Sequence, residues 1–139
     1  MRSHRIRILI ADDSPSALEI LTELVADEED LELVGVAQEA AAAIELARLH
    51  RPDVALLDVR MPGSGPRAAH EMHICSPETS LIALSAYDDV ETIAEMQGEW
   101  VEQYIVKGTA HAAEILRAIR GSARGQTILR KTGHDRPIG

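Results

Sequence analysis

The sequence predicts one doubly wound α/β domain with a five-stranded parallel sheet, and three observations support this prediction. First, short runs rich in Ile, Val and Leu alternate with segments whose apolar residues recur at helical spacing. Second, Pro, Gly and Ser cluster where one kind of segment gives way to the other. Third, 139 residues suffice for one such domain but not for two ordinary ones. Strands that alternate with helices form a parallel sheet with helices on both faces.

Five apolar runs have the length and composition of buried strands. They are Ile6–Ala11, Leu31–Ala37, 54–59, 81–85 and 104–106. A helix is expected after each strand, and three of these helices have a clear apolar face. The faces consist of Leu18, Leu21 and Val25 in the first helix, Ala40, Ile44 and Ala47 in the second, and Ala112, Ile115, Leu116 and Ile119 in the last. The third helix is predicted over residues 67–75, where the apolar stripe is thin.

The predicted helix ends carry residues that start or stop helices. Ser14 places a hydroxyl directly before Pro15, as an N-cap before the first helical position does. Pro52 ends the second helix, and Thr109 is placed to cap the last one. A loop rich in Gly and Pro, residues 61–66, precedes the third helix.

Composition restricts the functions that the chain can have. Hydrophobic residues make up 45% and aromatic residues 2%, with no Phe, so an aliphatic core is expected. A net charge of −9 argues against a nucleic-acid-binding surface. The single cysteine, Cys75, cannot form a disulfide within the chain, which fits a reducing compartment. The apolar run 8–11 behind a basic N-terminus is too short for a signal peptide or a membrane span, so a soluble cytoplasmic protein is expected.

Chemically distinctive residues stand at the ends of four predicted strands. They are Asp12 and Asp13 after the first strand, Asp58 in the third, Ser85 in the fourth and Lys107 after the fifth. Parallel strands bring these ends to one edge of the sheet, where ligands bind in such folds. Three carboxylates repel one another unless a hard cation such as Mg²⁺, or the Lys107 ammonium, compensates. This set suits phosphoryl transfer, in which a carboxylate can act as the nucleophile.

Each of these residues also has an ordinary structural interpretation. Asp12 and Asp13 fit a helix N-terminus through the helix dipole, and Lys107 fits an exposed surface position. Asp58 is harder to explain in this way, because an unpaired carboxylate is costly inside an apolar strand. The joint placement of these residues at equivalent strand ends favours a site over separate structural roles.

At four motifs the chain resembles the receiver domain of two-component response regulators. The motifs are residues 8–14 (ILIADDS), 52–63 (PDVALLDVRMPG), 82–86 (IALSA) and 104–107 (YIVK). The resemblance covers about residues 5–124 and implies a flavodoxin-like fold with strand order 2-1-3-4-5. The predicted receiver domain is residues 1–124, and residues 125–139 are predicted to be a basic tail or the start of a linker to an output domain.

The resemblance implies a role for each site residue. Asp58 resembles the phosphoacceptor, and it would share Mg²⁺ with Asp13, Asp12 and the backbone carbonyl of Arg60. Lys107 and Ser85 resemble the side chains that contact the phosphoryl group, and Val59 and Ala86 resemble its backbone N–H donors. Tyr104 resembles the aromatic switch residue, and Ser85 the switch hydroxyl. The phosphoryl donor would be a sensor histidine kinase or a phosphotransfer protein. The chain would not be an enzyme beyond its own phosphorylation and slow dephosphorylation. It would control an output, such as transcription through a further domain.

The resemblance also implies a homodimer through the fourth helix, fifth strand and fifth helix, with no direct contact to nucleic acid or membrane. This chain departs from the family at three places. Gly108 stands where many relatives have Pro, residues 100–103 (WVEQ) replace a common Gly-Ala-x-Gly, and residues 63–66 (GSGP) replace a loop with a larger apolar residue and Asp.

Other protein classes explain fewer of these residues. A haloacid-dehalogenase-type phosphatase needs a second Asp where this chain has Arg60, and the acids at 12 and 13 would repel the phosphate of a flavodoxin cofactor. His70 and His73 have the spacing of a zinc pair, but further ligands are not apparent. A receiver-shaped interaction module that is never phosphorylated remains the main alternative.

Overall fold

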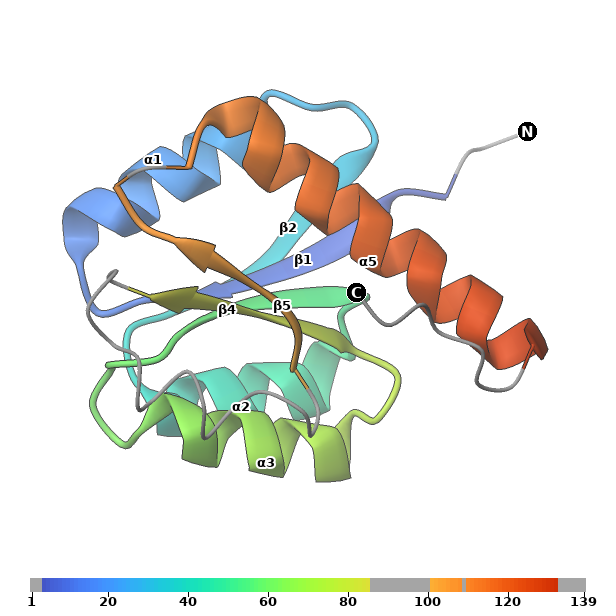
Figure 1. Ribbon diagram of the computed structural model, residues 1–139. Coiled ribbons are helices and arrows are strands. Elements are labelled where there is room, and N and C mark those ends of the chain that lie inside the picture. The colour runs from blue at the N-terminus through green and yellow to red at the C-terminus, as the bar shows by residue number, and fades with distance from the viewer. Residues whose placement is uncertain (1–3, 86–100, 109, 133–139) are drawn as a thin grey trace.

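The computed structural model describes residues 4–85, 101–108 and 110–132, with side chains as far as residue 123. All five strands pair in parallel in one sheet, in the order β2-β1-β3-β4-β5 (Figure 1). The strands are β1 (Ile6–Ala11), β2 (Leu31–Ala37), β3 (Val54–Asp58), β4 (Ser80–Ser85) and β5 (Val101–Val106). The predicted fold class and strand order are confirmed.

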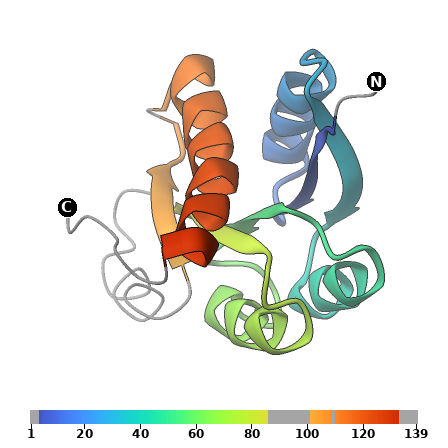
Figure 2. The same cartoon turned by 90° about the vertical axis from the view of Figure 1, so that its right-hand side faces the viewer.

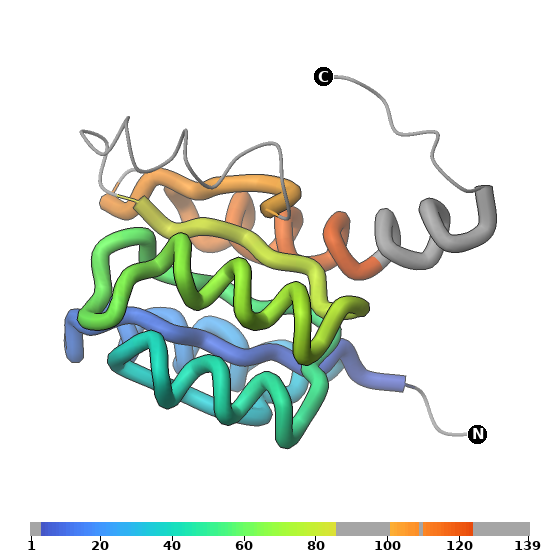
Figure 3. The backbone as a smooth tube through the Cα atoms, turned by 90° about the horizontal axis from the view of Figure 1, so that it is seen from below, coloured from blue at the N-terminus to red at the C-terminus, as the bar shows by residue number. Residues whose placement is uncertain are grey.

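Four helices flank the sheet within the described residues. They are α1 (Pro15–Ala26), α2 (Ala40–His50), α3 (Gly65–Cys75) and α5 (Ala112–Thr132). Helices α1 and α5 cover one face of the sheet, and α2 and α3 cover the other, as Figures 1 and 2 show. Figure 3 shows α2 and α3 lying side by side. The predicted fourth helix, between β4 and β5, and the predicted cap at residue 109 lie outside the described residues.

Helix boundaries follow the capping residues in the sequence. The Ser14 hydroxyl accepts a hydrogen bond from the Ala17 N–H at 3.3 Å, and Pro15 begins α1. Arg51, which ends α2, has the left-handed conformation that commonly terminates helices, with φ 47°. The Ser64 hydroxyl caps α3 through the Arg67 N–H at 3.2 Å. The predicted start of α1 and end of α2 are confirmed.

The core is aliphatic among the described residues, as predicted, and its two layers differ. Beneath α2 and α3 the buried side chains are mostly small, including Ala43, Ala47, Ala68 and Ala69, so these helices can approach the sheet closely. Beneath α1 and α5 the layer consists mainly of Ile, Leu and Val. The central strand β3 is buried along its whole length, which matches its continuous apolar run.

Several elements differ from their predicted limits, and the largest differences are in β5 and α5. Strand β5 begins at Val101 instead of residue 104, because parallel pairing with β4 continues through the polar pair Glu102 and Gln103. Helix α5 continues to Thr132, past residue 124, where the glycines at 121 and 125 weaken the sequence signal for a helix. Strand β3 ends one residue earlier than predicted and α3 begins two residues earlier. Within the described part of the chain, no helix has the length and apolar character needed to span a membrane.

Candidate acidic site at the carboxyl end of the sheet

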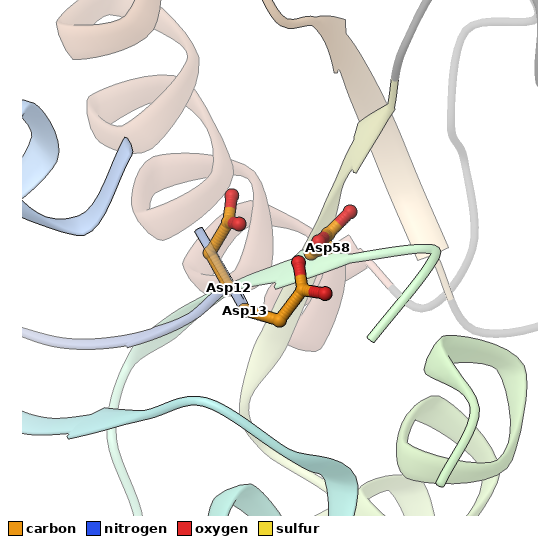
Figure 4. Close-up of side chains that lie close together, drawn as sticks. All are labelled: Asp12, Asp13 and Asp58. Carbon is orange, nitrogen blue, oxygen red and sulfur yellow. The ribbon is translucent and has the colours of Figure 1, made fainter. Parts of the chain in front are cut away.

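Three carboxylates converge at the carboxyl end of the sheet. Asp12 and Asp13 directly follow β1, and Asp58 ends the neighbouring strand β3 (Figure 4). One oxygen from each carboxylate can be chosen so that all three lie within 4.8 Å of one another. The predicted convergence of these acids is therefore present in the structure, because parallel strands end at the same edge of the sheet.

Asp12 is fully buried and its charge is compensated on two sides. One carboxylate oxygen accepts a hydrogen bond from the Ser14 N–H at 2.9 Å, which also shapes the turn into α1. The other lies 3.0 Å from the Lys107 ammonium. Asp13, in contrast, is exposed to solvent. The acids of this pair therefore differ in environment: Asp12 is part of an internal ion pair, whereas Asp13 faces solvent.

Lys107 joins the acids from the far edge of the sheet. Its ammonium lies 3.0 Å from Asp12 Oδ2 and 3.5 Å from Asp58 Oδ1, with 28% of the side chain exposed. Its backbone N–H donates to the Ser85 carbonyl at 2.8 Å, which fixes the end of β5 to β4. Burial disfavours the charged ammonium, but the hydrogen bond to Asp12 and the charge of Asp58 outweigh burial and raise the pKa of Lys107.

Gly108 gives the segment after Lys107 a backbone that proline cannot adopt. Its φ is 89°, in the left-handed region that favours glycine, whereas proline is restricted to about −65°. No heavy atom lies within 4 Å of the position that a Cβ would take here. Gly108, which replaces the proline common in the family, therefore has a backbone conformation that proline could not take.

Asp58 is 3% exposed, and its carboxylate is electrostatically unfavourable in this site. Burial raises the pKa of Asp58 from 3.8 to about 6, and the negative charge of Asp12 and a hydrogen bond with Asp13 act in the same direction. The Arg60 N–H and the Lys107 ammonium act in the opposite direction. The positive charge and hydrogen-bond donors around Asp58 therefore do not fully offset the cost of burying its negative charge.

The two backbone N–H groups that follow Asp58 donate to different partners. The Val59 N–H, predicted to face the phosphoryl group, donates to the Leu84 carbonyl at 2.9 Å. The Arg60 N–H points instead to Asp58 Oδ1 at 3.1 Å. Sequence reasoning considered only the carbonyl of Arg60, because the direction of a backbone N–H in a loop cannot be read from residue types. The assignment of Val59 stays a prediction, and it requires its hydrogen bond to Leu84 to break.

The remaining predicted site residues lie around the cluster. Ser85 is fully buried at the end of β4, one residue beyond the partner of Asp58 in the β3–β4 register. Tyr104 is 43% exposed on β5. Residue 86, predicted as a backbone donor, lies outside the described residues. The parts of Ser85, Tyr104 and residue 86 in switching stay predictions.

Sequence reasoning missed the role of Gly65. A Cβ on this residue would lie 2.6 Å from the Asp58 carbonyl oxygen and 2.7 Å from Val59 Cα. The first turn of α3 therefore packs directly on the backbone that carries Asp58, and only glycine fits. The sequence signal, a Gly between Ser64 and Pro66, is an ordinary loop pattern that does not reveal this close approach.

The Gly65→Ala substitution is expected to destabilise the protein by about 1–3 kcal/mol, because the contacted atoms are backbone and cannot move cheaply. Chemical denaturation followed by circular dichroism would measure this loss. Gly121→Ala is a matched control, because its Cβ would meet nothing within 4 Å and alanine favours the helix. The control is expected to be neutral or slightly stabilising, and a loss of similar size in both variants would contradict the packing argument.

The donor set fits a hard divalent cation and a phosphoryl group. Carboxylate and carbonyl oxygens are the ligands that Mg²⁺ prefers, and three carboxylates with one ammonium leave net negative charge for a cation to neutralise. The cation would be held by Asp12, Asp13, Asp58 and the carbonyl of Arg60. An ammonium beside a carboxylate and a metal suits the transfer of a phosphoryl group.

Known proteins are similar to this chain along most of its length. A profile of the family described as response regulator receiver domain matches residues 8–120. An uncharacterised transcriptional regulatory protein of Bacillus subtilis, YxjL, is 34% identical over 131 residues, which are 94% of this chain and 60% of that protein. The probable transcriptional regulatory protein NarL of Mycobacterium tuberculosis is 29% identical, over 90% of this chain and 58% of that protein. The chain thus spans about three fifths of the length of these curated relatives.

Solved structures show the same likeness. The signal receiver domain of the putative response regulator NarL from Mycobacterium tuberculosis superposes with a TM-score of 0.82 at 30% identity, covering 88% of this chain and 99% of that one. The signal receiver domain of an HD domain-containing protein from Pseudomonas fluorescens has a TM-score of 0.84 at 25% identity, covering 94% of this chain and 96% of that one.

Proposed function

This chain belongs to the response regulator receiver domain family, and on that premise we propose that it accepts a phosphoryl group on Asp58 in a Mg²⁺-dependent reaction and thereby switches an output. One observation carries this proposal: a buried carboxylate with a raised pKa lies among two further acids and an ammonium at the carboxyl end of the sheet. A structural ion pair alone would need one acid for the one ammonium, whereas this site has two acids more than the ammonium can neutralise.

The proposed reaction moves a phosphoryl group from a histidine of a sensor kinase or phosphotransfer protein. An Asp58 carboxylate oxygen attacks the phosphorus, the bond from phosphorus to the donor histidine nitrogen breaks, and the histidine keeps the electron pair. Bound Mg²⁺ supplies charge neutralisation on the transferred group. Asp58 reacts as its anion, so the raised pKa still leaves the reactive form dominant at neutral pH.

Other residues would respond to the new phosphoryl group. Lys107 would pair with its oxygens, and the Ser85 hydroxyl would move to bond it. The Arg60 N–H already points at the Asp58 carboxylate and is well placed to donate as well. Tyr104 would turn inward as Ser85 moves. These contacts would stabilise one of two pre-existing arrangements, which is a population shift.

The output is proposed to lie in a further domain of a longer protein. The chain spans about three fifths of relatives whose names describe transcriptional regulators, so control of transcription through a DNA-binding domain is the favoured output. The net charge of −9 supports a receiver that does not itself contact nucleic acid, and we expect a cytoplasmic location. Dimerisation through the face of the predicted fourth helix, β5 and α5 is a further expectation, which sedimentation velocity with and without beryllium fluoride would measure.

Intact-protein mass spectrometry after incubation with acetyl phosphate and Mg²⁺ tests the proposal. We expect the mass of one phosphoryl group to be added to the wild type, to be removed by hydroxylamine, and to be absent when chelator replaces Mg²⁺. Asp58→Asn should stay unmodified, whereas Asp53→Asn, at the half-buried position just before the opposite end of β3, should accept the phosphoryl group like the wild type. A wild type that gains no mass and shows no spectral change with beryllium fluoride would indicate a receiver-shaped interaction module instead.

A further inference from the structure

The Gln103 side chain, outside the acidic site, connects β5 to α5. Its Nε2 donates hydrogen bonds to the Ala118 carbonyl at 3.0 Å and to the Ser122 hydroxyl at 2.8 Å. Ser122 is 2% exposed, and its carbonyl in turn accepts from the Ser80 hydroxyl at 3.4 Å. These contacts are partly shielded from water, and losing one partner of a shielded hydrogen bond is costly. They tie the edge strand of the sheet to the middle of α5.

A β-bulge directs Gln103 towards α5. Val101 pairs with Leu81 and Gln103 pairs with the next residue of β4, so Glu102 is an extra residue in the strand. Val101 packs in the layer beneath α2 and α3, whereas Gln103, two residues later, reaches α5 on the opposite face. Without the extra residue the two side chains would share a face. The bulge therefore places a polar side chain where it meets the helix.

The face of β5 that carries Gln103 leads to Lys107. Residues two apart on a strand share a face, so Gln103 and Ile105 lie in one row, and Lys107 follows directly after β5 ends, with its N–H still bonded to the Ser85 carbonyl of β4. Ile105 is buried in the same core layer as Ile119 of α5. At the end of the row, the Lys107 ammonium reaches Asp12 and Asp58. The position of β5 relative to α5 and the sheet thus sets where the Lys107 backbone starts and how far its side chain reaches.

We propose that Gln103 is a positioning residue for Lys107. By holding β5 against α5, Gln103 keeps the Lys107 ammonium within reach of Asp12 and Asp58. Gln103 stands directly before Tyr104, at a position where the resemblance leads one to expect glycine, so the contact belongs to this chain. The consequence for phosphorylation rests on the proposed function of Asp58. The geometric claim about Lys107 does not, and the two can be measured separately.

Lysine-selective carbon-13 labelling tests the geometric claim without any phosphorylation. The chain has two lysines, Lys107 and Lys131, so their Cε signals can be assigned with Lys107→Arg. Gln103→Met, which keeps the length of the side chain but removes the donor, is expected to shift the Lys107 signal and leave Lys131 unchanged. Ser80→Ala is the matched control: it removes a hydrogen bond to the same Ser122 from β4, and its Lys107 signal is expected to match the wild type. An unchanged Lys107 signal in folded Gln103→Met would overturn the proposal.

The rate of phosphorylation by acetyl phosphate tests the functional consequence. In Gln103→Met the misplaced Lys107 ammonium is expected to lose about one hydrogen bond's free energy, about 1 kcal/mol, in the transition state. The phosphorylation rate of this variant should therefore fall about fivefold. Ser80→Ala should keep the wild-type rate even if its thermal stability falls by as much as that of Gln103→Met. Equal slowing of both variants, in proportion to their loss of stability, would make Gln103 merely structural and overturn the proposal.

Two further results keep these outcomes separate. Should Gln103→Met fail to fold by circular dichroism, Ser122→Ala removes one of the two contacts from the α5 side, and it is expected to shift the Lys107 signal less; no shift in that variant would count against the proposal. If the wild type accepts no phosphoryl group, the proposed function of Asp58 fails, while the Lys107 signal still decides the role of Gln103.

Discussion

Replacing Lys107 with methionine is expected to destabilise the metal-free protein by about 2–4 kcal/mol, somewhat less than the loss of a partner from a fully buried ion pair because the lysine is partly exposed. The substitution leaves the fully buried carboxylate of Asp12 without its cation and removes the only ammonium near Asp58 among the described residues. Urea denaturation in the presence of a chelator would measure the change in the free energy of unfolding.

Arg48→Met is the matched control for Lys107→Met. It also removes one cation from an ion pair, but Arg48 and its partner Glu45 are more than half exposed. Such a pair contributes little, so a change within about 0.5 kcal/mol is expected. Added Mg²⁺ should stabilise Lys107→Met more than the wild type, because in the variant Mg²⁺ does not compete with the Lys107 ammonium for the carboxylates. Equal losses in the two variants, without a larger effect of Mg²⁺, would show that Lys107 does not compensate the acids.

The sequence predicted the sheet and the meeting of the acids because both depend on periodicity and topology. A buried strand such as β3 reads directly as an apolar run, and parallel strands bring Asp12, Asp13 and Asp58 to one edge whatever the details of their loops. Lys107 was placed for the same reason. Predicting the strand order and the edge where these residues meet requires no knowledge of how their side chains pack.

What the sequence did not predict depends on contacts between distant backbones. The need for glycine at Gly65 arises from its approach to β3, and the direction of the Arg60 N–H arises from the course of one loop. The bulge at Glu102 reverses the face of the preceding residues in β5, which residue types alone do not show. The early start of β5 was missed for a related reason: tertiary pairing with β4 extends a strand through polar residues that favour no strand by themselves.

Asp58→Asn is expected to have the opposite effect to Lys107→Met and to stabilise the metal-free protein at pH 7.5. The pKa of Asp58 is about 6 in the folded protein, against 3.8 for an unperturbed aspartate, so between these pH values the folded state binds more protons than the unfolded state. Stability contributed by this group therefore decreases as pH rises from 4 to 6, and the full penalty is present above 6. A shift of this size corresponds to about 3 kcal/mol, and solvent access beside the exposed Asp13 reduces the expected gain to about 1–2 kcal/mol.

The dependence on pH and metal identifies the origin of this gain. Denaturation at pH 4 should show little difference between Asp58→Asn and the wild type, because the carboxyl group is then largely protonated in the folded state. Asp13→Asn removes the same charge from an exposed position and should gain less at pH 7.5. With saturating Mg²⁺ the advantage of Asp58→Asn should shrink or reverse, since the wild type offers one more anionic ligand. A gain that is equal at both pH values and unaffected by Mg²⁺ would mean that repacking, and not relief of charge, is its cause. The expected pattern would show that the folded protein keeps an unfavourable carboxylate in the one place where a cation and a phosphoryl group can relieve it.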